Sequence, residues 1–283
     1  FCGRIQIPPA PPRRLSPCRY DIRSLSSLQG QPLTLRILSI AAAGFHSLLL
    51  WGPPGTGKTM AAQGRLSLLP PPSSDEVLET AFIYNSINLP ILPHRPFRSP
   101  HHTVSPYALI GGGVPIHPGE VSLAHHGILF LDELPEFSRS SLEALRQPLE
   151  DLKVNISRVQ QSVSFPADFL LVSSMNPCPC GFYPDRTRCT CSISQVQNYQ
   201  RRIRGPLLDR IDLEMKMDPP GYDALVPVAE TDLTSLLSHI QQAHALQSAR
   251  YAALPFSYNS RIPPELIDRF CPLDTDGQNL MRS

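Results

Sequence analysis

The sequence has few charged and aromatic residues and no long apolar run. Charged residues make up 17% of its 283 positions and aromatic residues 7%. Lysine plus arginine (25) almost balances aspartate plus glutamate (24), which gives a net charge of +1. This balance excludes a polyanion partner held by overall charge, so any nucleic-acid contact has to come from local basic patches. No apolar run approaches the ~18 residues of a membrane span, and no secretory hydrophobic segment is present.

Cysteine and proline, by contrast, are plentiful, with 7 and 32 residues. Seven cysteines without a secretory segment favour a reducing compartment, so we expect the protein in the cytoplasm. Proline is about twice as frequent as usual, and several prolines lie among arginines near the start of the sequence. We expect residues 1–20 to form a disordered leader rich in proline and arginine. The hydrophobic content of 41% is typical of a globular fold for the remainder.

A complete phosphate-binding loop directly follows the apolar run Leu48–Leu50. The loop comprises Gly52, Pro53, Pro54, Gly55, Thr56, Gly57, Lys58 and Thr59. A strand that enters a glycine-rich turn and then a helix is the context that this motif requires. The glycines let backbone N–H groups curl around a phosphate, Lys58 can reach the β- and γ-phosphates, and the Thr59 hydroxyl can hold Mg²⁺. The sequence therefore predicts a site for ATP and Mg²⁺.

A pair of carboxylates follows a second apolar run. Gly127–Leu131 is typical of a parallel strand that is covered on both faces, and it ends in Asp132 and Glu133. By itself such a pair is more often a solvated strand end. Ligands of open α/β sheets lie beyond the carboxyl ends of the strands, so here we expect Asp132 to bind Mg²⁺ through water. Glu133 is then placed to polarise the water that attacks the γ-phosphate.

A third strand is predicted at Phe169–Val172, shortly before Asn176. We expect Asn176 to lie between the ends of the two earlier strands, as a polar contact for the γ-phosphate and the attacking water. The alternative is an ordinary turn asparagine before Pro177.

Four cysteines are arranged as two close pairs eight residues apart. They are Cys178, Cys180, Cys189 and Cys191. Four thiolates could saturate one tetrahedral Zn²⁺, and such a site would be structural because no ligand position stays open. Free thiols or a redox disulfide are the alternatives.

Arg210 is a candidate for a catalytic arginine. Its planar, permanently charged guanidinium suits phosphate oxygens, and an arginine from a neighbouring subunit can stabilise the charge of the transition state. The alternative is a surface ion pair with Asp209 or Asp212. Arg146 is a weaker candidate for the same role.

Basic side chains gather in two places that could touch nucleic acid, although a solvated face is an equal alternative. One is a predicted hairpin over Val154–Phe165 and its surroundings, and the other is a short arginine-rich segment. The residues are Lys153, Arg158, Arg201, Arg202 and Arg204.

Further elements follow from local patterns. We expect a helix over Gln31–Ala43 and another that begins with the capping pair Ser73 and Glu76. The Pro-, Gly- and His-rich region Pro90–Pro118 is interpreted as an insertion, and Gly64-Arg65 is expected to interrupt the helix after the phosphate-binding loop.

Helical runs are also expected near the end of the chain, after the break at Asp218-Pro219. The first carries Leu233, Leu236, Leu237 and Ile240, and the second begins at Pro263-Pro264. Six histidines fall between His94 and His126 without a regular ligand spacing. We expect them to pack or to form hydrogen bonds, with neighbouring histidines pointing to opposite sides.

The order of these motifs resembles that of AAA+ ATPases. More narrowly, residues from about Gln29 to Asp218 resemble the magnesium-chelatase-related group that includes the competence protein ComM, also called YifB. The similarity extends over continuous sequence segments, namely Arg98–Thr103, Leu109–Gly113, Pro118–His125, Leu131–Phe137, Met175–Gly181 and Gly205–Asp212.

The resemblance implies an α/β fold, a P-loop AAA+ three-layer arrangement around a parallel sheet with a partial C-terminal helical lid. It divides the chain into the leader (1–20), an ATPase core like that of the chelatase ChlI subunit (21–218) and part of the helical lid (219–283). In this group Asn176 corresponds to a sensor residue and Arg210 to the arginine finger. Relatives also carry an amino-terminal domain of the Lon-protease type and a longer lid with a nucleotide-sensing arginine, which implies a truncated representative.

The function implied is that of an ATP-hydrolysing motor that assembles into a hexameric ring and moves DNA during branch migration in recombination or transformation. Two alternatives stay open. One is a magnesium-chelatase-type motor that acts on a protein partner, and the other is a catalytically inactive nucleotide-binding remnant.

Overall fold

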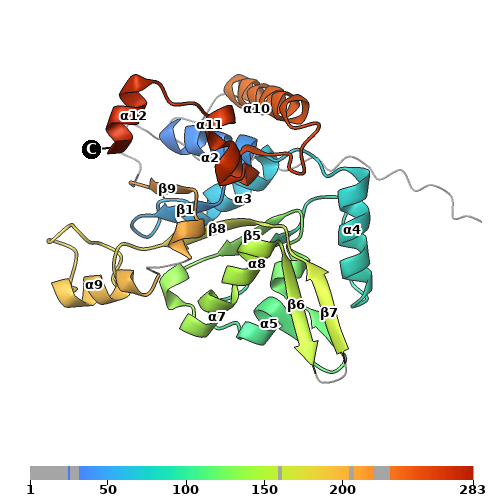
Figure 1. Cartoon of the computed structure of the whole chain (residues 1–283). Coiled ribbons are helices and arrows are strands. Elements are labelled where there is room, and N and C mark those ends of the chain that lie inside the picture. The colour runs from blue at the N-terminus through green and yellow to red at the C-terminus, as the bar shows by residue number, and fades with distance from the viewer. Residues whose placement is uncertain (1–24, 26–31, 159–160, 204–206, 220–229, 283) are drawn as a thin grey trace, which may run out of the picture.

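The computed structural model of the chain describes residues 25, 32–158, 161–203, 207–219 and 230–282 (Figure 1). The expected leader, residues 1–20, and Arg204 of the arginine-rich segment lie outside the described residues.

A sheet of five parallel strands forms the centre of the molecule. Its strands, in spatial order, are β2 (Phe97–Arg98), β5 (Ile128–Leu131), β8 (Leu170–Met175), β1 (Leu48–Trp51) and β9 (Leu213–Lys216). Because all five run in the same direction, their carboxyl ends meet at one edge of the sheet. β8 pairs with both β1 and β5, so the segment after β8 emerges between the segments that follow the other two strands.

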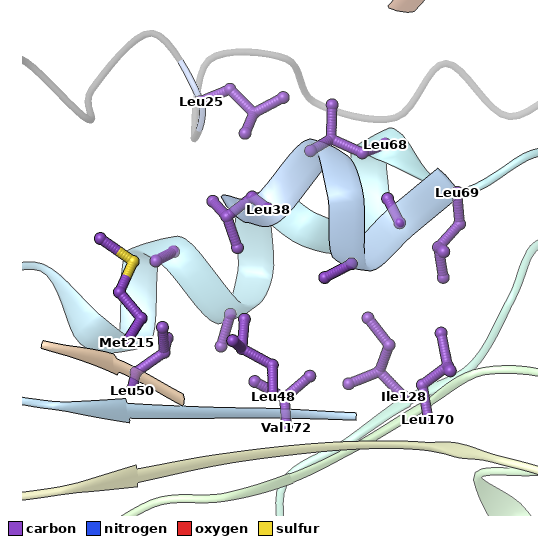
Figure 2. Close-up of a cluster of buried hydrophobic side chains, with 14 of the residues drawn as sticks. Leu25, Leu38, Leu48, Leu50, Leu68, Leu69, Ile128, Leu170, Val172 and Met215 are labelled. Atoms are coloured by element: carbon purple, nitrogen blue, oxygen red, sulfur yellow. The ribbon is translucent and has the colours of Figure 1, made fainter. Parts of the chain in front are cut away.

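Side chains of these strands alternate between two buried layers, as successive residues of a strand point to opposite faces. Leu48 and Leu50 pack under α2 (Pro32–Gly44) and α3 (Lys58–Leu68) (Figure 2). Leu49, between them, belongs to the core on the other face. The predicted α/β fold with three layers around a parallel sheet is therefore confirmed.

Short helices cover the second face of the sheet. They are α5 (Pro106–Ile110), α6 (Glu120–Leu123), the 3-10 turn η1 (Leu134–Glu136), α7 (Arg139–Ala144), α8 (Arg146–Asp151) and α9 (Ile193–Arg201). The hairpin of β6 (Lys153–Arg158) and β7 (Gln161–Pro166) extends beside them (Figure 1), as predicted. A small pair of strands, β3 (Gly111–Gly112) and β4 (His117–Pro118), precedes α6.

The structure contains the helices expected near the start of the described region. α2 is described from Pro32, and Gln31, the expected first residue, lies outside the described residues. α4 (Ser74–Asn85) begins with a complete capping box, in which the Ser73 hydroxyl accepts from the backbone N–H of Glu76 and the Glu76 carboxylate accepts from the backbone N–H of Ser73.

Two expectations about irregular segments were wrong. α3 continues through Gly64 and Arg65, because both are buried by tertiary packing and the Arg65 guanidinium donates to the carbonyls of Ala41 and His46. The region Pro90–Pro118 is not simply an insertion, since its β2 segment forms an edge strand of the central sheet.

Helical segments follow residue 229. They are α10 (Glu230–Arg250), the 3-10 turns η4 (Asn259–Arg261) and η5 (Pro264–Leu266), α11 (Ile267–Phe270) and α12 (Thr275–Arg282). Leu233 and Ile240 of α10 join the core cluster that includes Leu38 of α2, and the Gln247 amide donates to the Ala43 carbonyl at 2.7 Å. This helix therefore packs on the part of the chain that contains the central sheet, and the division into an ATPase core and a lid stays a prediction. Among the residues that the structure describes, no helix has the length and apolar character needed to cross a membrane.

Candidate nucleotide site

The phosphate-binding loop joins the end of β1 to the start of α3. Gly55 (φ 80°) and Gly57 (φ 85°) adopt the left-handed conformation, which side chains with a Cβ rarely accept. A Cβ atom built on Gly55 would meet no other atom within 4 Å, so this part of the loop borders open space. The loop therefore leaves room at the N-terminus of α3, where backbone N–H groups attract an anion.

Lys58 lies between the ends of β1 and β8. Its ammonium donates to the carbonyls of Gly52 (2.8 Å) and Pro53 (2.9 Å) and to Oδ1 of Asn176 (3.1 Å). Burial lowers the pKa of Lys58 below its ordinary value, while the charges of the carboxylates after β5 oppose that shift. The lysine and the asparagine predicted from separate motifs are thus in direct contact.

The residues expected to bind Mg²⁺ also lie together. The Thr59 hydroxyl is 3.3 Å from Oδ2 of Asp132. The other oxygen of Asp132 accepts from the Ser174 hydroxyl and from the backbone N–H of Glu133 (3.1 Å), and these bonds fix the orientation of the carboxylate. A hydroxyl and a carboxylate are oxygen ligands of the kind that Mg²⁺ prefers, so these side chains fit the ion.

Glu133 is exposed at the same edge of the sheet. Its backbone adopts a left-handed conformation (φ 54°), which is uncommon for a residue with a side chain and is concentrated at functional sites. Its carboxylate lies 3.6 Å from Nδ1 of His102. The geometry leaves the Glu133 carboxylate accessible to a water molecule near the loop.

Sequence reasoning missed Ser174 and the pairing of His102 with Glu133. A weak signal for Ser174 was present, because Ser173-Ser174 interrupts an otherwise apolar strand and both serines are buried. No local signal indicated that His102 would meet Glu133, since the two residues belong to separate loops.

Arg210 lies in the 3-10 turn η2 (Leu208–Arg210) and forms an ion pair with α8. Its Nε donates to Oε1 of Glu150 at 3.2 Å, and Nη2 donates to the same oxygen. The neighbours considered from the sequence are not the partners in this pair. Asp212 accepts from the backbone N–H of Ser47 at 2.8 Å instead. Both charges of the pair are about half exposed, so it contributes little to stability.

A basic hollow lies between α7 and α9. It has a volume of about 700 Å³, and its lining includes the apolar side chains of Phe137 and Leu142. Four arginines line it, namely Arg139, Arg146, Arg201 and Arg202. Glu143 and Glu136 pair with Arg139 (2.9 Å) and Arg202 (3.4 Å), which leaves an excess of positive charge along the hollow.

The four cysteines of the paired motif come together after β8. Sγ of Cys178 lies 3.3 Å from that of Cys180 and 3.8 Å from that of Cys189, and all four sulfurs lie within 4.8 Å of one another. None of these four cysteines is joined in a disulfide in this structure, and the zinc and redox interpretations both stay predictions. A backbone N–H of Phe182 is the main cause that lowers the pKa of Cys180 to about 5.

Two of the histidines form a hydrogen-bonded group with α4. His125 and His126 both contact Oε2 of Glu79, at 3.0 and 2.7 Å. Nδ1 of His125 accepts from the backbone N–H of Asp168, so the proton of the neutral ring is on Nε2, and Nε2 donates to Glu79. This confirms a hydrogen-bonding role. The expectation that neighbouring histidines point apart was wrong, because these two rings lie 3.7 Å apart.

Comparison with known proteins identifies the family. The sequence model described as "Magnesium chelatase, subunit ChlI" matches residues 24–225. The competence protein ComM of Haemophilus influenzae is 49% identical over 256 residues, which cover 88% of this chain and 49% of ComM. The uncharacterized protein YifB of Escherichia coli is 43% identical over 259 residues, which cover 89% of this chain and 50% of YifB. The chain thus spans about half the length of the curated relatives it matches.

Two solved structures are similar at low sequence identity. NtrX from Brucella abortus in complex with ATP has a TM-score of 0.45 at 17% identity, covering 89% of this chain and 49% of NtrX. The complex between subunits BchI and BchD of magnesium chelatase has a TM-score of 0.44 at 19% identity, covering 94% of this chain and 72% of the matched subunit. The family match covers more than half of the sequence, and the chain therefore belongs to the magnesium chelatase ChlI family of AAA+ ATPases, in the group related to ComM and YifB.

Proposed function

We propose that this chain binds Mg-ATP at the phosphate-binding loop and hydrolyses it. The observation that carries the proposal is the meeting of three separate motifs at one edge of the sheet. Lys58 contacts Asn176 at 3.1 Å, and Thr59 contacts Asp132 at 3.3 Å. These groups are the ones that a nucleoside triphosphate and its metal ion require.

Each of these side chains has a distinct role in the proposal. Lys58 neutralises the β- and γ-phosphates, and Thr59 and Asp132 hold Mg²⁺, which neutralises charge on the phosphate oxygens. Asn176 contacts the γ-phosphate and orients the attacking water. Glu133 accepts the proton of that water as it attacks.

We further propose that the chain acts in a ring, of six subunits as the resemblance implies, in which Arg210 completes the neighbouring subunit's site. Within the described residues its contacts are to α8 and not to its own phosphate-binding loop. Release from the exposed Glu150 costs little, because pairs of this kind contribute about 0–1 kcal/mol. An arginine supplied from a neighbour can stabilise the charge on the transferred phosphoryl group.

The substrate we propose is DNA, moved through or around the ring during branch migration. The basic hollow supports this role, since four arginines at an open surface can contact phosphates locally although the net charge is only +1. The similarity to a competence protein points in the same direction. The second candidate is a chelatase-type motor on a protein partner, which the family match favours.

ATP hydrolysis with and without DNA separates these functions. We expect turnover of Mg-ATP that rises when duplex or four-way-junction DNA is added. Stimulation by DNA supports the first candidate, whereas turnover that DNA leaves unchanged contradicts it and favours the protein-directed motor. If the parent protein binds Mg-ATP but does not hydrolyse it, the chain is instead a catalytically inactive nucleotide-binding remnant.

The Glu133→Gln variant tests the chemistry separately from binding. It keeps the shape of the side chain and removes the base, so we expect Mg-ATP affinity to stay close to that of the parent and hydrolysis to fall by ~10²-fold or more. Glu214→Gln, at an exposed position on β9, is the matched control and should retain parental turnover. Loss of nucleotide binding in Glu133→Gln would instead assign Glu133 to metal binding or to structure.

We also propose that the four cysteines hold one structural Zn²⁺. Sulfurs around a tetrahedral zinc, at about 2.3 Å from the metal, lie about 3.8 Å from one another. The distances of 3.3, 3.6 and 3.8 Å between Cys178, Cys180 and Cys189 are close to that value. The thiolates would have to stay reduced, which agrees with the cytoplasm expected from the sequence.

A further inference from the structure

The cysteine cluster lies directly against the phosphate-binding loop. Gly181, between Cys180 and Phe182, adopts a left-handed conformation (φ 87°). A Cβ atom placed on Gly181 would lie 2.6 Å from Cδ of Pro54 and 3.9 Å from Cγ of Asn176. The turn that carries the cysteines therefore packs closely against Pro54 of the phosphate-binding loop and lies near Asn176.

Backbone hydrogen bonds hold this turn close to the sulfurs. The N–H of Gly181 donates to the carbonyl of Cys178 at 2.9 Å, and the N–H of Tyr183 donates to Sγ of Cys178 at 3.3 Å. Cys178 itself is fully buried. The position of Gly181 against Pro54 therefore depends on where Cys178 and Cys180 are held.

A second connection runs along the chain. Asn176, whose amide oxygen accepts from Lys58, is two residues before Cys178. The Gln200 amide of α9 donates to the carbonyl of Pro177 at 3.1 Å, between these two positions. The segment that carries the four cysteines therefore begins two residues after Asn176 and ends at Cys191, just before the start of α9.

We propose that zinc held by the four cysteines presses the Gly181 turn against Pro54 and fixes Asn176, so that metal occupancy sets the affinity of the site for nucleotide. Without the metal, only weak contacts between the thiols hold the segment from Cys178 to Cys191. The segment then occupies many conformations. Pro54 and Asn176 lose a fixed neighbour, and Lys58 loses a fixed partner. The inference rests on the Mg-ATP site and the zinc site proposed above.

The test measures zinc content and Mg-ATP affinity on the same samples of the whole 283-residue chain, prepared under reducing conditions. Zinc is removed with a chelator selective for zinc over magnesium, while Mg²⁺ is kept in excess, and is then added back. We expect about one zinc per chain, a loss of Mg-ATP affinity of ~10-fold or more on removal, and recovery on addition of zinc. A site that holds its binding geometry for about a tenth of the time or less loses affinity by that factor. Circular dichroism checks that the metal-free chain stays folded.

The Gly181→Ala variant tests the contact between the Gly181 turn and Pro54 without removing a metal ligand. It keeps all four thiols but forces the turn away from Pro54, so we expect normal zinc content with weakened Mg-ATP binding. Cys271→Ser, at an exposed cysteine outside the cluster, is the matched control and should change neither quantity. Cys189→Ser should lower zinc content and Mg-ATP affinity together.

Each other outcome overturns a different step. Protein without zinc contradicts the metal site. Affinity for Mg-ATP that is the same with and without zinc, or unchanged in Gly181→Ala, contradicts the coupling while leaving both sites intact. A zinc-loaded parent that binds no Mg-ATP contradicts the proposed nucleotide site and this inference with it.

Discussion

At the scale of single residues, Lys58 shows how the phosphate-binding loop holds a positive charge. Its ammonium is half buried and donates to two carbonyls of the loop and to Asn176. These acceptors are neutral, so a phosphate that arrives can replace them with a stronger, charge-assisted interaction. The carbonyls hold the lysine in place, and no carboxylate of the residues that the structure describes forms a direct ion pair with it.

We predict that Lys58→Ala abolishes tight binding of Mg-ATP. Loss of a hydrogen-bonded charge pair costs about 1.5–3 kcal/mol, so the affinity should fall by ~10- to 100-fold or more. Isothermal titration with a nonhydrolysable ATP analogue measures the effect. Lys216→Ala is the control, because Lys216 is an exposed lysine that pairs with Asp218. Equal affinities of Lys58→Ala and the parent would remove the basis of the proposed site.

At the scale of elements, the start of α4 is tied to the central sheet by one buried ion pair. Arg95 is almost completely buried and donates to both oxygens of Glu76 at 3.0 Å. Arg95 also donates to the carbonyls of Pro70 and His126, each at 2.7 Å. Glu76 completes the capping box with Ser73, so one carboxylate holds together a helix end and the segment that precedes β2.

We predict that this link makes stability depend on pH. Burial by itself would raise the pKa of Glu76, but the charge and hydrogen bonds of Arg95 and the backbone N–H of Ser73 outweigh it and lower the pKa below 4.5. The folded-state pKa is therefore below that of the unfolded chain. Glu76 stabilises the fold fully above about pH 4.5, and this contribution is lost as the pH falls through the lowered folded-state pKa.

Urea unfolding of the parent and Glu76→Gln from pH 7 to pH 3 measures the effect. We expect Glu76→Gln to be less stable by roughly 1–3 kcal/mol at pH 7, with the difference shrinking as the pH falls. Glu143→Gln, at an exposed pair on α7, should differ little from the parent at any pH. A difference for Glu76→Gln that stays constant over this range would contradict the ionic contribution.

At the scale of the whole molecule, the arginine proposed to act in catalysis contacts α8 and, within the described part of the chain, not its own phosphate-binding loop. Arg210 pairs with Glu150 of α8, beside a hollow lined by Ser47, Asp209 and Asp212. The proposed chemistry therefore depends on assembly.

We predict that Arg210→Ala binds Mg-ATP as the parent does but loses ~10³-fold or more in turnover by the assembled ring. Mixed with Lys58→Ala subunits it should recover part of the activity. In a mixed ring, an intact loop from one variant meets an intact arginine from the other. Co-purification of tagged and untagged subunits shows that mixed rings form, and Arg250→Ala serves as a control for loss of an exposed arginine. Proven mixed rings without recovery would argue against an arginine acting between subunits.

The features that the sequence determined by itself are those set by neighbouring residues. The phosphate-binding loop, the apolar strands and the capping box of α4 depend on contacts within a few positions along the chain, so their patterns were readable. The resemblance to sequence segments of a known family added the assignment of Asn176 as a sensor and of Arg210 as an arginine finger, and both remain predictions.

Tertiary structure decided what long-range packing controls. The order of the strands places Asn176 beside Lys58, and no local pattern encodes that order. Gly64 and Arg65 fit inside a continuous helix because tertiary packing buries both, and Nη2 of Arg65 donates to carbonyls of another helix and its following loop. The contact of Gly181 with Pro54 joins residues more than a hundred positions apart. Such contacts depend on the packing of whole elements, and propensity, capping and periodicity carry information only about near neighbours.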